Sequence, residues 1–280
     1  MNKNNSFSDT LEKHFNPRES VPDYKKFLNK SFQNSKNANL ILEGHRDIKY
    51  GNGSLQNLDI FGNKKAYKSP IHIFIHGGYW RALDKNYHYH MALPFNDHDI
   101  IFCNLNYDLC PKVSINEICN QVIDAIIWIF KNNETYNYDR EKITISGHSA
   151  GAHLVSYLIS TKWEKYNLPK NIIKGAALIS GIYDLEIVKK ISVNDDLNLT
   201  DVDVEKLSTI KRLPSQNLPL IVAYGGKEPE GWKKQSLEYK KNLEKNNFNV
   251  QDIICNNDNH FSLIDALANK NTKICKNIIK

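Results

Sequence analysis

The sequence predicts an α/β protein with one mostly parallel sheet of about eight strands and helices on both faces. Short segments rich in Ile, Val and Phe recur along the chain, and segments of helical length separate most of them. Such alternation is typical of parallel strands joined by right-handed crossovers. The 280 residues contain no Gly/Ser-rich linker and no internal repeat, so we expect a single domain over residues 1–280.

Individual elements can be placed from the pattern of apolar residues. The clearest helix is expected over 115–130, where Ile118, Val122 and Ile126 repeat at the spacing of one buried face. Ser114 and Glu117 form an S-x-x-E capping box at its start, the usual way to satisfy the first free N–H groups. Strands are expected at 47–50, 58–61, 71–75, 100–105, 143–146, 175–179, 218–224 and 250–254.

Two segments are predicted to be short additions to the main domain. Residues 1–44 are polar, with a weak helical pattern near 24–32, and predict an N-terminal arm that packs on the domain. Residues 182–213 predict a small lid insertion, in which Thr200 and Asp203 would cap a short helix.

Charge and composition exclude several classes of function. The 37 basic and 31 acidic residues give a formal charge of +6, but the lysines occur singly or in pairs, which argues against nucleic-acid binding. No apolar run is long enough to span a membrane, and the polar first residues contain no signal-peptide core. We therefore expect a cytoplasmic protein with neither a nucleic-acid nor a membrane partner. The five cysteines form no C-x-x-C pair and predict reduced thiols.

The sharpest local motif is Gly147-His148-Ser149-Ala150-Gly151. It follows the apolar segment 143–146 and leads into a helical pattern beginning near His153. A nucleophilic serine needs this order of strand, tight turn and helix, because the turn lifts its hydroxyl to the edge of the sheet. Ser149 is therefore the predicted nucleophile.

A second motif, His76-Gly77-Gly78, ends the predicted strand 71–75. Acyl transfer creates an oxyanion, which backbone N–H donors stabilise when they are already in position. We expect Gly77 or Gly78 to supply one donor and Ala150, the residue after the nucleophile, to supply the other.

A serine nucleophile also needs a general base and an acid that orients it. His260 is the predicted base, since it follows the last expected strand and is the only histidine after His153. Glu228, in the loop after the strand 218–224, is the preferred acid. Glu230 in the same loop and Asp184 after the preceding strand stay open as alternatives.

These motifs together resemble the kynurenine formamidase (arylformamidase) branch of the α/β-hydrolase superfamily and its bacterial esterase relatives. The matching segments occur in order over most of the chain: Phe15-Asn16-Pro17-Arg18, Val21-Pro22-Asp23, Leu58-Asp59-Ile60-Phe61, His76-Gly77-Gly78-Tyr79-Trp80-Arg81, Asn106-Tyr107-Asp108-Leu109-Cys110-Pro111, Gly147-His148-Ser149-Ala150-Gly151-Ala152-His153, Ser180-Gly181-Ile182-Tyr183-Asp184-Leu185, Gln235-Ser236 and His260-Phe261.

The resemblance implies an α/β-hydrolase fold and a metal-free, cofactor-free serine hydrolase. It also implies a small aryl formamide such as N-formylkynurenine as substrate, and a place in tryptophan catabolism. One departure is Glu228, where this family usually has Asp. A short-chain carboxylesterase with the same residues is the first alternative, and a non-catalytic binding protein with this fold is the second. A homodimer is compatible with the sequence.

Three aromatic residues, Tyr79, Trp80 and Tyr183, are expected beside the nucleophile if this fold is correct. An aromatic amide could stack against them. Trp80 could equally pack the predicted oxyanion loop onto the domain, and the sequence leaves the two roles open.

Two groups of polar residues suggest metal sites but do not complete them. His88 and His90 are two residues apart on an expected helix, which separates their side chains, and no carboxylate or thiol joins them. The acidic segment 195–205 lacks the central Gly of a calcium loop and has Leu207 where the closing Glu would stand. We expect both groups to lie on the surface.

Overall fold

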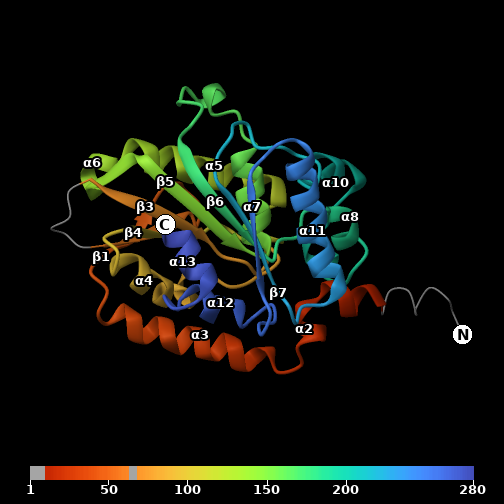
Figure 1. The fold of residues 1–280 in the computed structure, drawn as a ribbon. Coiled ribbons are helices and arrows are strands. Elements are labelled where there is room, and N and C mark those ends of the chain that lie inside the picture. The colour runs from red at the N-terminus through yellow and green to blue at the C-terminus, as the bar shows by residue number, and fades with distance from the viewer. Residues whose placement is uncertain (1–9, 63–67) are drawn as a thin grey trace, which may run out of the picture.

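The computed structural model describes residues 10–62 and 68–280, and places eight strands in one sheet between two layers of helices (Figure 1). Residues 1–9 of the predicted arm lie outside the described part. The strands are β1 (Gly44–Lys49), β2 (Asn57–Phe61), β3 (Ser69–Ile75), β4 (Ile101–Leu105), β5 (Tyr138–His148), β6 (Ile173–Ile179), β7 (Leu220–Gly225) and β8 (Val250–Cys255).

The predicted, mostly parallel sheet is confirmed. Its strands follow the order β1-β2-β4-β3-β5-β6-β7-β8. The pairs β1/β2 and β2/β4 are antiparallel, and every other neighbouring pair is parallel. The carboxyl ends of β3, β5, β6 and β7 therefore meet at one edge, which is where open α/β sheets bind their ligands.

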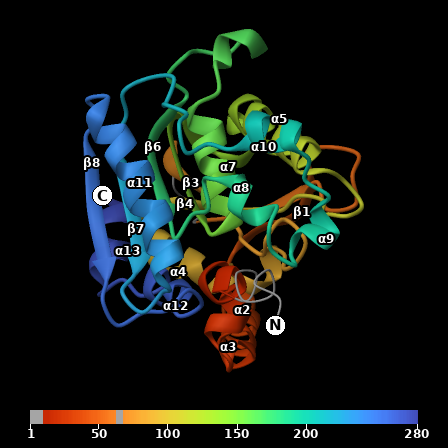
Figure 2. The same cartoon turned by 90° about the vertical axis from the view of Figure 1, so that its right-hand side faces the viewer.

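Helices cover both faces of the sheet, as Figure 1 and Figure 2 show. They are α2 (Pro17–Ser20), α3 (Tyr24–Asn39), α4 (Ala92–Asn96), α5 (Ile115–Lys131), α6 (Asn133–Tyr136), α7 (Ala150–Ile159), α8 (Leu185–Val188), α9 (Asn194–Leu197), α10 (Asp201–Leu207), α11 (Glu230–Lys245), α12 (Leu263–Leu267) and α13 (Lys273–Ile279), with single 3-10 turns at Lys85–Tyr87, Tyr89–Met91 and Trp163–Tyr166.

Two hydrophobic cores lie on opposite faces of the sheet because successive side chains of a strand alternate in direction. Ile73 and Ile75 of β3 pack into the core under α5, α7 and α11. Phe74, between them, packs into the second core with residues of α4, α12 and α13. Parallel strands that are covered on both faces have continuous apolar sequences, which is why β3 could be predicted.

The helix predicted over 115–130 is α5, and its capping box is confirmed. The Glu117 N–H donates to Ser114 Oγ at 3.2 Å, and the Ser114 N–H donates to Glu117 Oε2 at 2.7 Å. Ile118 and Val122 are completely buried in the first core. Two of the N–H groups that a helix leaves free at its start are thereby satisfied.

The N-terminal segment, residues 10–43, lies along one face of the molecule and contains α3 (Figure 1). This helix extends further than the pattern near 24–32 predicts. The Ser31 hydroxyl donates to the Tyr87 carbonyl oxygen at 2.7 Å, and Ser35 Oγ lies 2.9 Å from His90 Nδ1. Lys30 forms an ion pair with Asp265 at 2.8 Å. These contacts hold α3 against the turns that follow β3 and against α12.

Residues 182–213 form the short helices α8, α9 and α10. The expected cap of α10 is confirmed, since the Asp203 N–H donates to Thr200 Oγ1 at 3.2 Å. Asp195, Asp201 and Glu205 are exposed, as predicted for the acidic segment. The role of this segment as a lid stays a prediction.

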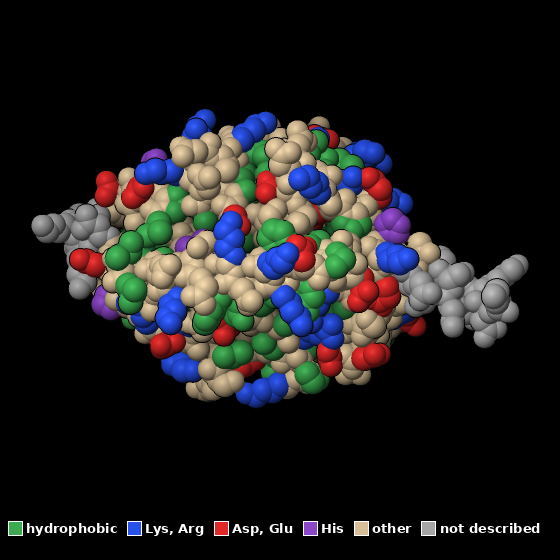
Figure 3. Space-filling view, turned by 90° about the horizontal axis from the view of Figure 1, so that it is seen from below, with side chains coloured by type: hydrophobic (Ala, Val, Ile, Leu, Met, Phe, Trp, Pro, Cys, Tyr) green, Lys and Arg blue, Asp and Glu red, His purple; other side chains and the backbone are tan. Residues whose placement is uncertain are grey.

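Charges of both signs are interspersed on the face seen from below in Figure 3. No helix in the described residues is both long and apolar enough to cross a membrane. All five cysteines are free thiols.

Candidate active site

Ser149 lies in the sharp turn between β5 and α7, where two glycines make the turn sterically possible. Its backbone has φ 59° and ψ −122°, a strained conformation for a residue with a side chain. A Cβ on Gly147 would lie 2.3 Å from the Gly151 carbonyl oxygen, and one on Gly151 would lie 2.0 Å from the Ile75 carbonyl oxygen. This geometry is that of a nucleophile elbow.

The loop after β3 lies directly against that turn. A Cβ on Gly77 would come within 2.9 Å of Ser149 Cβ, so only glycine allows the two segments to approach this closely. His76 fixes the loop from the other side, because its Nδ1 lies 2.8 Å from the Gly77 carbonyl oxygen and its ring stacks on Tyr107 with centroids 4.4 Å apart.

The predicted oxyanion donors belong to two segments that approach each other at Gly77 and Ser149. In the described part of the chain, the N–H groups of Gly77 and Gly78 make no backbone hydrogen bond. Ala150 is the first residue of α7, and an N–H at that position has no partner within its own helix. The partial positive charge of a helix N-terminus adds to the attraction for an anion there.

Glu228 and His260 form a buried hydrogen-bonded pair. His260 Nδ1 lies 2.5 Å from Glu228 Oε1, and both side chains are almost fully buried. The other carboxylate oxygen, Oε2, accepts hydrogen bonds from the Ser180 hydroxyl at 2.6 Å and from the Gly225 N–H at 2.8 Å. The carboxylate is thus fixed from both sides and holds the imidazole in one orientation.

The two alternative acids lie elsewhere. Asp184 caps α8, where its Oδ1 accepts a hydrogen bond from the Glu186 N–H at 3.0 Å. Glu230 begins α11 with its side chain 80% exposed and forms an ion pair with Lys233. Of the three candidate acids, Glu228 alone forms a hydrogen bond with His260 in the structure.

Three aromatic rings lie close to the His260 ring. The ring centroids of Trp232 and His148 lie 4.4 Å and 4.6 Å from that of His260, and Phe261 forms an edge contact at 5.6 Å. Burial lowers the pKa of His148 well below its usual value, with the neighbouring His260 as a second cause. His148 is therefore a neutral neighbour of the predicted base.

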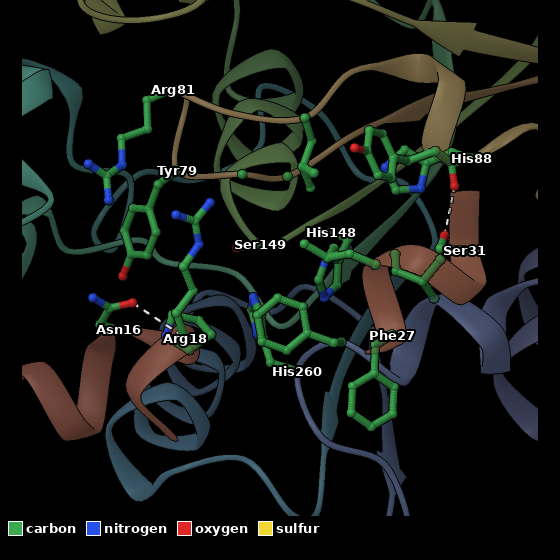
Figure 4. A pocket seen from close by; sticks show the side chains of 18 residues that line it. Asn16, Arg18, Phe27, Ser31, Tyr79, Arg81, His88, His148, Ser149 and His260 are labelled. Atoms are coloured by element: carbon green, nitrogen blue, oxygen red, sulfur yellow. Dashed lines mark hydrogen bonds between the residues drawn. The ribbon is translucent and has the colours of Figure 1, made fainter. Parts of the chain in front are cut away.

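Ser149 and His260 line one cavity, which Figure 4 shows from close by. The cavity is bounded by the turn after β3, by the segment around His260 and by the N-terminal segment. The lining residues are Asn16, Pro17, Arg18, Phe27, Leu28, Ser31, Gly77, Gly78, Tyr79, Arg81, Leu83, Tyr87, His88, His148, Ser149, His260, Phe261 and Ile264.

One of the three expected pocket aromatics is among these residues, and two are not. Tyr79 lines the cavity, and its hydroxyl donates to the Phe15 carbonyl oxygen. Trp80 is completely buried and packs edge-on against His153 at 5.0 Å, which is the packing role left open above. Tyr183 is also completely buried and stacks on Tyr239 at 4.3 Å.

The prediction that His88 and His90 lie on the surface is wrong. Both are buried, at 3% and 5% exposure, beneath the N-terminal segment. Neither ring nitrogen of His88 has a hydrogen-bond partner among the described residues. The prediction failed because the spacing of His88 and His90 in the sequence does not reveal that α3 covers their side chains. Within the described ranges, no three His, Cys, Asp or Glu residues cluster as a metal site would require.

Several residues of the site were not singled out from the sequence for the roles they have. Ser180 and Trp232 contact Glu228 and His260, and Pro17, Arg18 and Phe27 line the cavity from the N-terminal segment. A signal existed for Ser180, Pro17 and Arg18, because they lie in segments that carry the family resemblance. Trp232 and Phe27 had no comparable signal.

Comparison with known proteins places these features in a family. A family model described as BD-FAE matches residues 58–209, which is more than half of the chain. Kynurenine formamidase from Danio rerio is 30% identical over 84% of this chain and 80% of its own length. The chain belongs to the kynurenine formamidase-like α/β-hydrolases. The resemblance inferred from its motifs is confirmed.

Other relatives of this formamidase-like hydrolase agree. Kynurenine formamidase from Salmo salar is 28% identical, over 97% of this chain and 95% of its own. A hyperthermophilic esterase from Pyrobaculum calidifontis superimposes with a TM-score of 0.70 at 16% identity, covering 92% of this chain and 90% of its own. At that identity the likeness supports the fold alone. The homologues named kynurenine formamidase identify the chain as a hydrolase enzyme of the α/β-hydrolase type.

Proposed function

We propose that this enzyme is a serine hydrolase that cleaves the formyl group from an aryl formamide, with Ser149, His260 and Glu228 as its catalytic triad. The buried Glu228–His260 pair beside the strained Ser149 turn carries the proposal. The relatives named kynurenine formamidase support the substrate class.

The first half of the reaction forms an ester on the enzyme. Ser149 Oγ attacks the formyl carbon while His260 Nε2 takes its proton. Glu228 stabilises the imidazolium that results. The N–H groups of Gly77 or Gly78 and of Ala150 donate to the oxygen that becomes negatively charged. His260 then returns the proton to the aryl nitrogen, the C–N bond breaks, and the amine leaves.

The second half releases formate. A water molecule attacks the formyl ester of Ser149 as His260 removes a proton from it, and the same N–H groups stabilise the second tetrahedral intermediate. The C–O bond to Ser149 breaks, the proton on His260 passes to Ser149 Oγ, and the free enzyme is restored. Amide and ester substrates share these steps, so the short-chain carboxylesterase remains the nearest competing function.

A serine-directed phosphonate tests the nucleophile. We expect the phosphonate to label the wild-type protein once, at Ser149, and to leave Ser149→Ala unlabelled by intact mass. Labelling that is absent from the wild type or unchanged in the variant would remove the serine mechanism and favour a binding protein. Ser156→Ala is the matched control, because Ser156 is a buried serine whose hydroxyl bonds to Thr209 Oγ1 at 2.6 Å, away from the triad.

Side-by-side kinetics test the substrate class. We expect a higher specificity constant for N-formylkynurenine than for p-nitrophenyl acetate at the same pH. A specificity constant that is much higher for the ester would replace the formamidase proposal by that of a carboxylesterase. The cytoplasmic location and the absence of a nucleic-acid partner stay predictions.

A further inference from the structure

The cavity at Ser149 has a one-sided charge pattern. Its described lining includes two arginines, Arg18 and Arg81, and no Asp or Glu. Arg81 forms an ion pair with Asp196 of α9. Arg18 has no carboxylate partner among the described residues, so its positive charge is uncompensated at the cavity.

The N-terminal segment holds Arg18 in a defined place. The Arg18 backbone N–H donates to Asn16 Oδ1 at 3.2 Å. Arg18 is the second residue of α2, which begins at Pro17. The Arg18 guanidinium lies 5.5 Å above the Tyr24 ring, and that ring stacks on Phe261 with centroids 5.6 Å apart. Phe261 directly follows the predicted base. Figure 4 shows the Arg18 side chain extending into the space between Tyr79 and Ser149.

The other ionisable groups of the lining do not duplicate this charge. Burial lowers the pKa of His88 and of His148 well below the usual value, so both are neutral near pH 7. Burial also raises the pKa of Tyr79, which keeps its phenol neutral. Phe27 and Leu28 of α3 contribute apolar side chains to another part of the cavity lining (Figure 4). An anion entering this cavity meets one cation without a carboxylate partner, in a lining that also includes apolar side chains.

We propose that Arg18 is a specificity-determining residue that binds a carboxylate on the amine half of the substrate. The inference rests on the proposed function in one respect. The formyl carbon of a formamide is bonded only to hydrogen, the carbonyl oxygen and the amide nitrogen, so any charged group of the substrate must lie on the leaving amine. The planar guanidinium matches a carboxylate with two parallel hydrogen bonds. The aromatic part of the amine would pack against Phe27 and Phe261.

Arg18→Met tests the proposal, because it removes the charge and keeps much of the length of the side chain. The substrates are N-formylkynurenine and its methyl ester, which differ in the carboxylate charge. We expect the variant to raise KM for the acid about tenfold, as for a partly exposed charge-assisted hydrogen bond, with kcat nearly unchanged. KM for the methyl ester should stay within about twofold of the wild-type value, and Arg18→Lys should restore part of the loss.

Arg140→Met is the matched control. Arg140 is also exposed and lies 5.1 Å above an aromatic ring, that of Phe130, but it belongs to the opposite end of β5 from Ser149. The control loses the same charge and the same type of ring contact. Because Arg140 does not line the cavity, its loss should leave KM for both substrates unchanged. Equal changes in KM for the acid and the ester in Arg18→Met, or no change for the acid, would overturn the proposal.

A pair of esters separates this inference from the proposed function. If the wild type hydrolyses neither formamide, the formamidase proposal fails. The subsite is then tested with 4-carboxyphenyl acetate and phenyl acetate. A preference for the carboxylate that falls about tenfold in Arg18→Met would support the subsite on its own. A preference that is absent from the wild type, or unchanged in the variant, would overturn it.

Discussion

At the scale of single residues, the Glu228 carboxylate has each oxygen in a defined hydrogen bond. Oε1 meets His260 Nδ1 at 2.5 Å, and Oε2 accepts from Ser180 and Gly225. A third group that orients the base is what separates a catalytic histidine from an incidental one. The extra methylene of Glu, compared with the Asp usual in this family, is accommodated without loss of that contact.

The first prediction concerns this acid. Glu228→Ala removes the group that orients and stabilises the His260 imidazolium, so kcat should fall about 10⁴-fold with little change in KM. Glu230→Ala is the matched control, since Glu230 lies two residues further along the chain, at the start of α11, and its side chain is 80% exposed. Steady-state kinetics on N-formylkynurenine make the comparison. Near-normal activity of Glu228→Ala would show that another residue is the acid.

The residues of the proposed triad could be singled out from the sequence more readily than the cavity walls. Ser149 and His260 occupy positions where strand order and motif leave few alternatives. Motif and strand order do not determine where the three aromatic side chains lie, because the direction of each depends on loop conformation. These residues are Tyr79, Trp80 and Tyr183. Tyr79 and Trp80 have φ of 50° and 55°, values that no short-range pattern predicts. One ring therefore lines the cavity and the next is buried in the core.

At the scale of elements, the turn between β5 and α7 depends on a close approach of backbone segments. The second prediction is that Gly151→Ala destabilises the protein by about 3 kcal/mol or more, since its Cβ would lie 2.0 Å from the Ile75 carbonyl oxygen. Gly175→Ala is the control, because its Cβ would meet Thr144 Cγ2 at 3.6 Å, an ordinary contact. Urea unfolding measures both. Equal stability of the two variants would contradict the packing described for the turn.

Element boundaries were predicted well where apolar residues reach the end of an element. β3 and α5 are such cases. β5 begins at Tyr138, five residues before its predicted start, because Arg140, Glu141 and Lys142 occupy its exposed end and hide the strand pattern. α3 continues to Asn39 for a similar reason, since polar residues dominate its last turns.

At the scale of the whole molecule, buried histidines make stability depend on pH. Burial lowers the pKa of His72 from 6.5 to about 3, and those of His90 and His153 from 6.5 to about 4. Below pH 6.5 the unfolded chain binds protons that the folded chain does not, so stability is present above that pH and is lost as the pH falls towards 4. Each such histidine contributes up to about 1.4 kcal/mol per pH unit.

The third prediction is therefore a steep fall in the free energy of unfolding between pH 6.5 and 4. Urea unfolding over this range gives the slope of the unfolding free energy against pH, which reports the number of protons taken up on unfolding. His72→Gln should lower that number by up to one. His45→Gln should leave it unchanged, because His45 is exposed. Stability that stays constant from pH 6.5 to 5 would contradict the neutral state of these buried rings.

The contribution of the N-terminal segment to the cavity is also a property of the whole molecule. The Tyr79 hydroxyl bonds to the Phe15 carbonyl oxygen, 64 residues away in the chain, and Ser31 bonds to Tyr87, 56 residues away. The sequence predicted an arm that packs on the domain. Its place at the cavity depends on these long-range contacts, which periodicity and spacing do not encode.

The role of Ser149 in formamide hydrolysis is tested by the rates at which the wild type and Ser149→Ala hydrolyse N-formylkynurenine. The proposed mechanism predicts saturable turnover by the wild type and a loss of about 10⁵-fold or more in kcat for the variant, which keeps the fold but lacks the nucleophile. Equal rates for the two proteins, or no hydrolysis by a folded wild type, would contradict it.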